Sequence, residues 1–182
     1  GRFLAVRVHT IGNIGAYASS HGRTVPTDGY AAGITGLYTV PVYHVSVDVV
    51  FTNMMMTDAY RGAGRPEAIY VIERLVDAAA AALDIARDEI RRRNLIPESA
   101  MPYRTATGEV HDSGQFERNM TEALKAADAA RFEARRAAAH ARGRLLGLGL
   151  STYVKINGGM PNELAEVRVE QGGGVAVIIG TQ

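Results

Sequence analysis

A glycine-rich turn that carries two arginines, DAYRGAGRPEA, opens directly into an amphipathic run. Gly62 and Gly64 carry no Cβ, so the backbone there can turn sharply and come close to a ligand. Pro66 suits the first turn of a helix, where its missing N–H would have no partner, and the free N–H groups and positive dipole end would point into the turn. Arg61 and Arg65 add forked donors that suit an oxyanion. The turn therefore indicates an anion site, and a helix cap flanked by solvated arginines is the alternative.

Other reactive side chains lie in patterns that do not indicate a metal site or a catalytic group. The histidines lack the spacing of metal ligands and are interpreted as surface or core residues: His9, His21, His44, His111 and His140. The three consecutive methionines at 54–56 would point in different directions on any regular backbone, which favours packing over metal binding. Glu163, Glu166 and Glu170 are interpreted as solvated carboxylates on the face of a strand.

The composition is that of an ordinary globular protein and excludes several classes of site. The chain has 182 residues, of which 47% are hydrophobic, and a net charge of +1, so no strong field favours nucleic acid or an anionic membrane. Without cysteine it forms no disulfide, zinc–thiolate site or iron–sulfur cluster. No apolar run reaches the ~18 residues of a membrane span and no signal peptide is recognisable, so we expect a cytoplasmic protein.

The hydrophobic pattern predicts strands, then helices, then strands, which indicates an α+β fold. Strands are expected at 2–9, 42–51, 145–156, 164–170 and 175–179, and a region of loops with short structured pieces at 10–40. Helices are expected at 66–83, at 87–94 and, in two parts broken near Ala127-Asp128, over 115–142. Asp128 is expected to cap the second part of that last helix. Gly172–Gly174 is expected to join the last two strands as a hairpin, and Gly158–Pro161 to form a turn.

Three regions are expected along the chain. Residues 1–83 hold strands, the glycine-rich turn and its helix; 84–115 form a connecting segment; and 116–182 hold helices followed by a sheet that includes the hairpin. The chain begins without methionine inside an expected strand and stops where a strand leads into a loop. We therefore expect an internal fragment of a longer protein, one that is not catalytically complete by itself.

The glycine-rich turn, together with the preceding Thr52-Asn53, resembles the active-site loop of one enzyme family. This family comprises the molybdopterin-binding large subunits of xanthine dehydrogenases, aldehyde oxidases and carbon monoxide dehydrogenases. The likeness is greatest to large chains of the carbon-monoxide-dehydrogenase type that have glycine instead of cysteine in this loop. Similar pieces follow in the family's order: Gly15-Ala16-Tyr17, Arg91–Ile96, Met101-Pro102-Tyr103, Thr107-Gly108, Ser113-Gly114, Gly147-Leu148-Gly149 and Tyr153-Val154. The resemblance covers essentially the whole chain.

The resemblance implies a set of cofactor-binding residues within the loop. These residues are Tyr60, Arg61, Gly62, Ala63, Gly64 and Arg65. Their backbone N–H groups would face the pterin or an oxygen ligand of the metal. No catalytic residue and no metal ligand is implied within the chain, because the family's glutamate base would lie beyond residue 182. Lys155 stands where the family commonly has an acidic residue.

The function implied is that of a fragment of a molybdenum hydroxylase, an oxidoreductase that hydroxylates an aldehyde or an N-heterocycle with oxygen from water. The implied cofactor is molybdenum–molybdopterin, usually in its cytosine dinucleotide form in bacteria, and we expect the fragment alone not to bind it stably. The implied partners are iron–sulfur and FAD subunits or domains, in a dimer of heterotrimers, and a small-molecule substrate. The alternative is a non-catalytic interaction or assembly module in which the Arg-Gly turn only caps a helix.

Two positions in the loop bear on the substrate. Family members that oxidise carbon monoxide have a cysteine at the position of Gly62, where its sulfur bridges to copper. Members that oxidise purines have a phenylalanine at the position of Ala63, and its ring packs on the substrate. The resemblance therefore implies that neither carbon monoxide nor a purine is the substrate of this protein.

Overall fold

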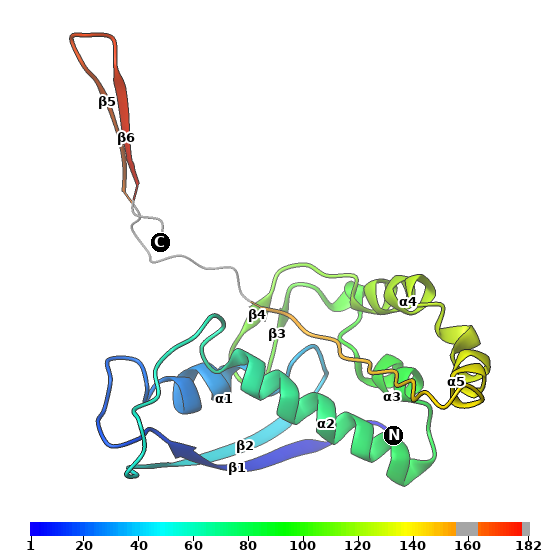
Figure 1. Cartoon of the computed structure of the whole chain (residues 1–182). Coiled ribbons are helices and arrows are strands. Elements are labelled where there is room, and N and C mark those ends of the chain that lie inside the picture. Colours follow the sequence, from blue (N-terminus) through cyan, green and yellow to red (C-terminus); the bar gives the residue numbers. More distant parts are fainter. Residues whose placement is uncertain (156–163, 180–182) are drawn as a thin grey trace.

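Two parallel strands, β1 (Ala5–Asn13) and β2 (Val42–Val50), form the sheet of the N-terminal half of the chain (Figure 1). The computed structural model describes residues 1–155 and 164–179. The strand expected at 2–9 begins later and continues to Asn13, because the alternating pattern extends past His9 into the glycine-containing stretch. The strand expected at 42–51 is confirmed to within one residue.

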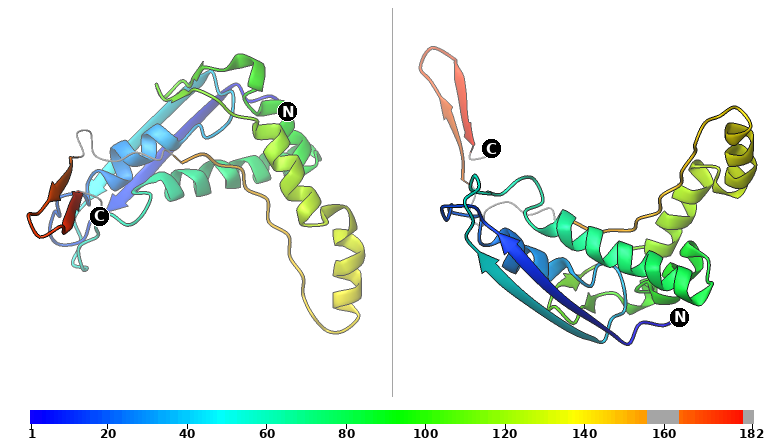
Figure 2. Two further views of the ribbon diagram at one scale, coloured as in Figure 1. Left: turned by 90° about the horizontal axis from the view of Figure 1, so that it is seen from above. Right: turned by 60° about the horizontal axis from the view of Figure 1, so that its bottom comes forward.

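Side chains alternate between the two faces of this sheet. On one face, Val8 is buried together with Tyr30 and Ile34 from the crossover between the strands. On the opposite face, His9 Nε2 lies 2.9 Å from Asp48 Oδ2 in an exposed ion pair. Helices therefore cover one face of the sheet, as Figure 1 and Figure 2 both show.

The crossover between the two strands contains a π-helical turn (Val25–Gly29) and α1 (Tyr30–Gly33). Both are too short to give a periodic pattern, which agrees with the expectation of short structured pieces within a loop region. This segment lies directly against the glycine-rich loop and supports it.

The two helices that follow the glycine-rich loop are confirmed: α2 (Arg65–Leu83) and α3 (Arg87–Asn94). Ile72, Val76 and Ala80 recur at helical spacing on α2 and are buried in the main apolar cluster. The cluster is completed by Leu37, Tyr38, Val40, Ile90 of α3, Leu95 and Met120. Helix α2 packs against α1 and α3.

The expected break in the alanine-rich region is also confirmed. It separates α4 (Phe116–Ala126) from a short 3-10 turn (Ala129–Arg131) and α5 (Phe132–His140). The expected cap is wrong: within the described structure, the Asp128 side chain makes no capping hydrogen bond and lies 3.9 Å from Arg131 Nε. The reason is that Asp128 adopts a left-handed backbone with φ 47°, whereas a capping residue needs an extended one.

The strand expected at 145–156 is wrong over its described part, because residues 145–155 are extended without a strand partner. Their backbone groups bond instead to side chains of α2 and α3: Arg91 donates to the Leu150 carbonyl, and the Thr152 N–H donates to Glu73. The expected turn at 158–161 and Glu163 lie outside the described residues.

A short antiparallel pair, β3 (Tyr103–Arg104) and β4 (Val110–His111), precedes α4, and the predicted C-terminal hairpin is confirmed as β5 (Ala165–Val169) and β6 (Val175–Ile179). The hairpin stands apart from the other elements in both figures (Figure 1, Figure 2). Together these elements confirm the α+β class. Among the described helices, none combines the length and the apolar character that crossing a bilayer requires.

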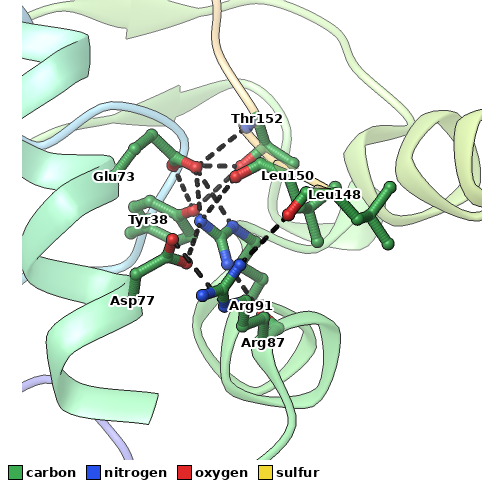
Figure 3. Close-up of polar contacts among 8 residues, drawn as sticks. All are labelled: Tyr38, Glu73, Asp77, Arg87, Arg91, Leu148, Leu150 and Thr152. Carbon is green, nitrogen blue, oxygen red and sulfur yellow. Dashed lines mark hydrogen bonds and ion pairs between the residues drawn. The ribbon is translucent and has the colours of Figure 1, made fainter. Parts of the chain in front are cut away.

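A buried ionic network joins the elements around α2 (Figure 3). Arg91 on α3 has no solvent exposure, and its Nη2 lies 2.8 Å from Glu73 Oε2 and 3.0 Å from Asp77 Oδ1, both on α2. The Tyr38 hydroxyl donates to Glu73 and also bonds the Thr152 hydroxyl at 2.8 Å. A buried guanidinium needs such partners, because an unpaired charge in the interior costs several kcal/mol.

The network shifts the pKa of two of its members. Burial raises the pKa of Tyr38 well above its ordinary value of 10.0, and the charge and hydrogen bond of Glu73 raise it further. Burial lowers the pKa of Arg91, but the hydrogen bonds and charge of Glu73 outweigh this and raise it above its ordinary value. Tyr38 therefore stays a neutral donor and Arg91 stays charged.

The glycine-rich loop is seated directly on the crossover. A Cβ on Gly64 would lie 2.2 Å from the Val25 carbonyl oxygen, and Gly64 has a φ of +89°. From the other side, a Cβ on Gly29 would lie 2.1 Å from the Ala63 carbonyl oxygen. Two glycines in different segments thus allow the backbones of the loop and the crossover to touch.

We predict that Gly64→Ala destabilises the chain by more than about 3 kcal/mol, because alanine there meets both a left-handed backbone and a backbone oxygen. Gly147→Ala is the matched control, since a Cβ there has no neighbour within 4 Å and no positive φ is involved. Urea denaturation of both variants measures the difference. Equal stabilities would contradict the proposed seating of the loop.

We also predict a pH-dependent effect of Tyr38→Phe. Because the folded state raises the pKa of Tyr38, its protonated form favours folding, and this contribution is complete below pH 10 and is lost as the pH rises further. The free energy of unfolding of the parent chain should exceed that of Tyr38→Phe by about 1–2 kcal/mol at pH 7, which is the contribution of a hydrogen bond to a charged group. The difference should be smaller at pH 11. Denaturation across this range tests it; a difference independent of pH would count against it.

Candidate functional site

A surface cavity of about 650 Å³ lies between the glycine-rich loop and the extended segment that follows α5. One wall comes from the loop and the first turns of α2: Arg61, Gly62, Arg65, Pro66, Ile69 and Tyr70. The facing wall comes from Ser151, Tyr153 and Lys155. Its volume lies within the range of small-molecule sites in proteins.

The two loop arginines differ in their surroundings. Arg65 is half-buried, and its Nη2 lies 2.8 Å from Glu109 Oε1 next to β4, so its charge is partly neutralised. Arg61 is exposed and, among the described residues, makes no hydrogen bond or ion pair. Arg61 is therefore the loop cation that is available to a ligand in the cavity.

The loop also uses part of its own hydrogen-bonding capacity. The Ala63 N–H donates to the Tyr60 carbonyl at 2.8 Å, and the Arg65 N–H donates to the Gly62 carbonyl at 3.0 Å. Within the described structure, the N–H groups of Arg61 and Gly62 make no hydrogen bond and remain as donors. The helix start thus offers fewer free N–H groups than the sequence suggested.

Gly62 lies on the loop wall of the cavity, close to residues of both walls. A Cβ at this position would lie 2.9 Å from the Pro66 ring and 3.9 Å from Cε of Lys155. Its φ of +96° also favours glycine. Glycine therefore lets the loop backbone lie close to the Pro66 ring, where a side chain would not fit.

The six residues predicted from the sequence separate into two groups. Arg61, Gly62 and Arg65 line the cavity, whereas Gly64 is buried against the crossover. Tyr60 is 83% exposed and, like Ala63, is not among the lining residues of this cavity. Half of the predicted loop thus forms the cavity wall, and the rest shapes or supports it.

Sequence reasoning did not identify the remaining lining residues as part of a site. Tyr70 lies four positions after Pro66 and so on the same face of α2. Its place beside the loop could therefore have been predicted from the helical spacing. The facing residues Ser151, Tyr153 and Lys155 alternate along an extended segment, but only the fold places them opposite the loop.

Other cavities lack these features. One of about 700 Å³ is lined by residues 114–126, mostly from the single helix α4, and another of about 610 Å³ lies between α3, α4 and Leu148–Leu150. Neither includes a residue of the glycine-rich loop. No group of three or more histidines and carboxylates that could hold a metal occurs within residues 1–155 and 164–179.

Comparison with known proteins agrees with the resemblance found in the sequence. Residues 1–95 match the molybdopterin cofactor-binding domain family. The carbon monoxide dehydrogenase large chain of Hydrogenophaga pseudoflava is 33% identical over 92% of this chain and 21% of its own length. The gamma subunit of the 6-hydroxypseudooxynicotine dehydrogenase complex of Paenarthrobacter nicotinovorans is 32% identical over 99% of this chain and 23% of its own length.

A solved structure supports the same relationship at the level of the fold. Quinoline 2-oxidoreductase from Pseudomonas putida 86 superimposes with a TM-score of 0.85 and 31% identity, over 97% of this chain and 24% of that chain. The chain spans about a fifth to a quarter of the length of these relatives. Because the family match covers more than half of its residues, the chain belongs to the molybdopterin cofactor-binding domain family.

Proposed function

We propose that the chain acts as part of the large subunit of a molybdenum hydroxylase, and that the cavity beside Arg61 contributes to its molybdopterin site. The observation that carries this proposal is the position of Arg61 and Gly62, two residues of the family's loop, on the wall of a 650 Å³ cavity. Membership of the molybdopterin cofactor-binding domain family supports it.

The residues of this chain would bind and orient the cofactor. When bound, the cofactor supplies the redox centre at which a carbon is hydroxylated with oxygen from water. The guanidinium of Arg61 and the N–H of Gly62 would donate to oxyanionic groups of this ligand. Tyr70 and Tyr153 offer apolar ring surface to its flat part. We assign the cytosine dinucleotide form to it by resemblance to the bacterial enzymes.

The proposed partners follow from what this chain cannot hold. Since it contains no cysteine, the iron–sulfur centres that carry electrons away would belong to other subunits or domains, together with FAD. The names of the relatives, a large chain and a complex subunit gamma, describe proteins that work within assemblies. We extend this to a dimer of heterotrimers for the present protein.

The alternative function is a non-catalytic assembly module, and one feature of the loop favours it. The hydrogen bonds inside the loop and the Arg65–Glu109 ion pair would suit a helix cap without any ligand. This alternative gives no role to Arg61, which these contacts leave unused. The two functions therefore differ in what the loss of Arg61 would do.

We predict that Arg61→Ala, made in the complete enzyme with its partner subunits, lowers turnover by two or more orders of magnitude and leaves the fold intact. An exposed arginine fills no core space, so its removal opens no apolar cavity. Arg74→Ala removes an exposed arginine from α2 outside the cavity and is the control. Turnover, circular dichroism and molybdenum content test this; near-normal turnover of Arg61→Ala would support the helix-cap alternative.

We predict that the enzyme oxidises an aldehyde or an N-heterocycle but neither carbon monoxide nor a purine. Gly62 offers no sulfur to bridge copper, and Ala63 offers no ring on which a purine could pack, a contact of about 1 kcal/mol. Metal analysis should find copper well below one equivalent per molybdenum. Assays with carbon monoxide, xanthine, aldehydes and N-heterocycles decide the matter, and efficient turnover of either of the first two would refute it.

A further inference from the structure

The extended segment Leu148–Lys155 presents two chemically different faces. Every second residue faces the helices: the Leu148 and Leu150 carbonyls accept from arginines of α3, and the Thr152 N–H and hydroxyl bond to Glu73. Leu150 and Val154 also pack on the main apolar cluster. The residues between them line the candidate cavity: Ser151, Tyr153 and Lys155.

Because of this alternation, the register of the segment determines which of its side chains face the cavity. In an extended chain, a slip of one residue exchanges the two faces. It would turn Tyr153 and Lys155 away from the cavity and bring Thr152 and Val154 toward it. Because the segment has no strand partner in the described structure, no ladder of backbone hydrogen bonds holds its register.

Glu73 supplies the register instead (Figure 3). Its Oε2 accepts from Arg91 Nε at 3.0 Å, from Arg91 Nη2 at 2.8 Å and from the Thr152 N–H at 3.0 Å. Its Oε1 accepts from Tyr38 and, at 3.3 Å, from the Thr152 hydroxyl. One oxygen of this buried carboxylate thus joins α3 to the extended segment, and the other joins Tyr38 to the same segment.

Arg91 repeats this arrangement from the opposite side. While it pairs with Glu73 and Asp77, its Nη2 also donates to the Leu150 carbonyl at 3.0 Å. The ion pair therefore presents an acceptor to Thr152 and a donor to Leu150, two positions apart on one face of the segment. This spacing matches a single register of an extended chain.

We propose that Glu73, held by Arg91, is a positioning residue for the candidate cofactor cavity: it fixes the register of Leu148–Lys155 and so places Tyr153 and Lys155 opposite Arg61. The register function stands on the geometry of this chain. Its effect on the cofactor rests on the function proposed above.

The test uses the complete enzyme with its partner subunits and compares two changes. Thr152→Val removes the hydroxyl from the segment and leaves the Arg91–Glu73–Asp77 ion pairs in place. Glu73→Gln removes the charge of the anchor. Glu89→Gln is the matched control, because Glu89 pairs with Arg93 on the exposed side of α3. Thr152→Ser restores the hydroxyl and is the conservative rescue.

The first measurement is amide hydrogen exchange in peptides covering residues 148–155. We expect exchange about tenfold faster than in the parent for Glu73→Gln and several-fold faster for Thr152→Val. In Thr152→Val, exchange in α2 and α3 should stay unchanged, and Thr152→Ser and Glu89→Gln should match the parent. Unchanged exchange of residues 148–155 in both Glu73→Gln and Thr152→Val would overturn the inference, whatever the protein binds.

The second measurement is the electron paramagnetic resonance spectrum of molybdenum in the reduced enzyme, at matched metal content. A spectrum altered in Thr152→Val and restored in Thr152→Ser supports the positioning role. If exchange rises but the spectrum and metal content match the parent, the positioning role at the cofactor is overturned. If the parent itself contains no molybdenum, the proposed function fails, and the exchange data still decide whether Glu73 sets the register.

Discussion

The fold around the candidate site depends on one arginine that has no access to solvent. Removing a guanidinium from water costs several kcal/mol unless carboxylates pair with it and its donors are used. Glu73 and Asp77 supply this compensation from one face of α2, so α2 and α3 cannot separate without leaving Arg91 unpaired. Glu73 and Arg91 also bond the backbone of a third segment, which has no strand partner within the described residues.

The apolar cluster and the ionic network contribute in different ways. Ile72, Val76 and Ile90 remove apolar surface from water, which is the dominant favourable term and has no directional preference. An apolar side chain in place of Arg91 could fill the same volume, but it could not donate a hydrogen bond to the Leu150 carbonyl. Buried backbone groups need partners, so an extended segment beside two helices requires polar side chains aimed at it. The network therefore fixes the position of the extended segment, which apolar packing alone would not fix.

The sequence allowed the elements to be predicted where the pattern is local. The periodicity of Ile72 and Val76 and the glycines before β6 are signals within one element, and the corresponding helix and hairpin are confirmed. The pattern over 145–155 is alternating, yet it does not reveal whether the backbone bonds to a strand or to side chains. Nor does any local pattern join Tyr38 to Glu73, 35 positions away. Consequently three residues of the loop wall, Arg61, Gly62 and Arg65, could be predicted from the sequence, and the facing wall could not.

The different roles of the two loop arginines have an electrostatic cause. Arg65 is the first residue of α2 and lies at the positive end of the helix dipole, where an unpaired cation is unfavourable. The ion pair with Glu109 removes that penalty and ties the helix start to β4. Arg61 precedes the helix, beyond Gly62 and Gly64, and is exposed, so it can keep its charge without a partner in the described chain. Both arginines line the cavity, but the charge of Arg65 is partly neutralised by Glu109, so the positive potential of the loop is concentrated at Arg61.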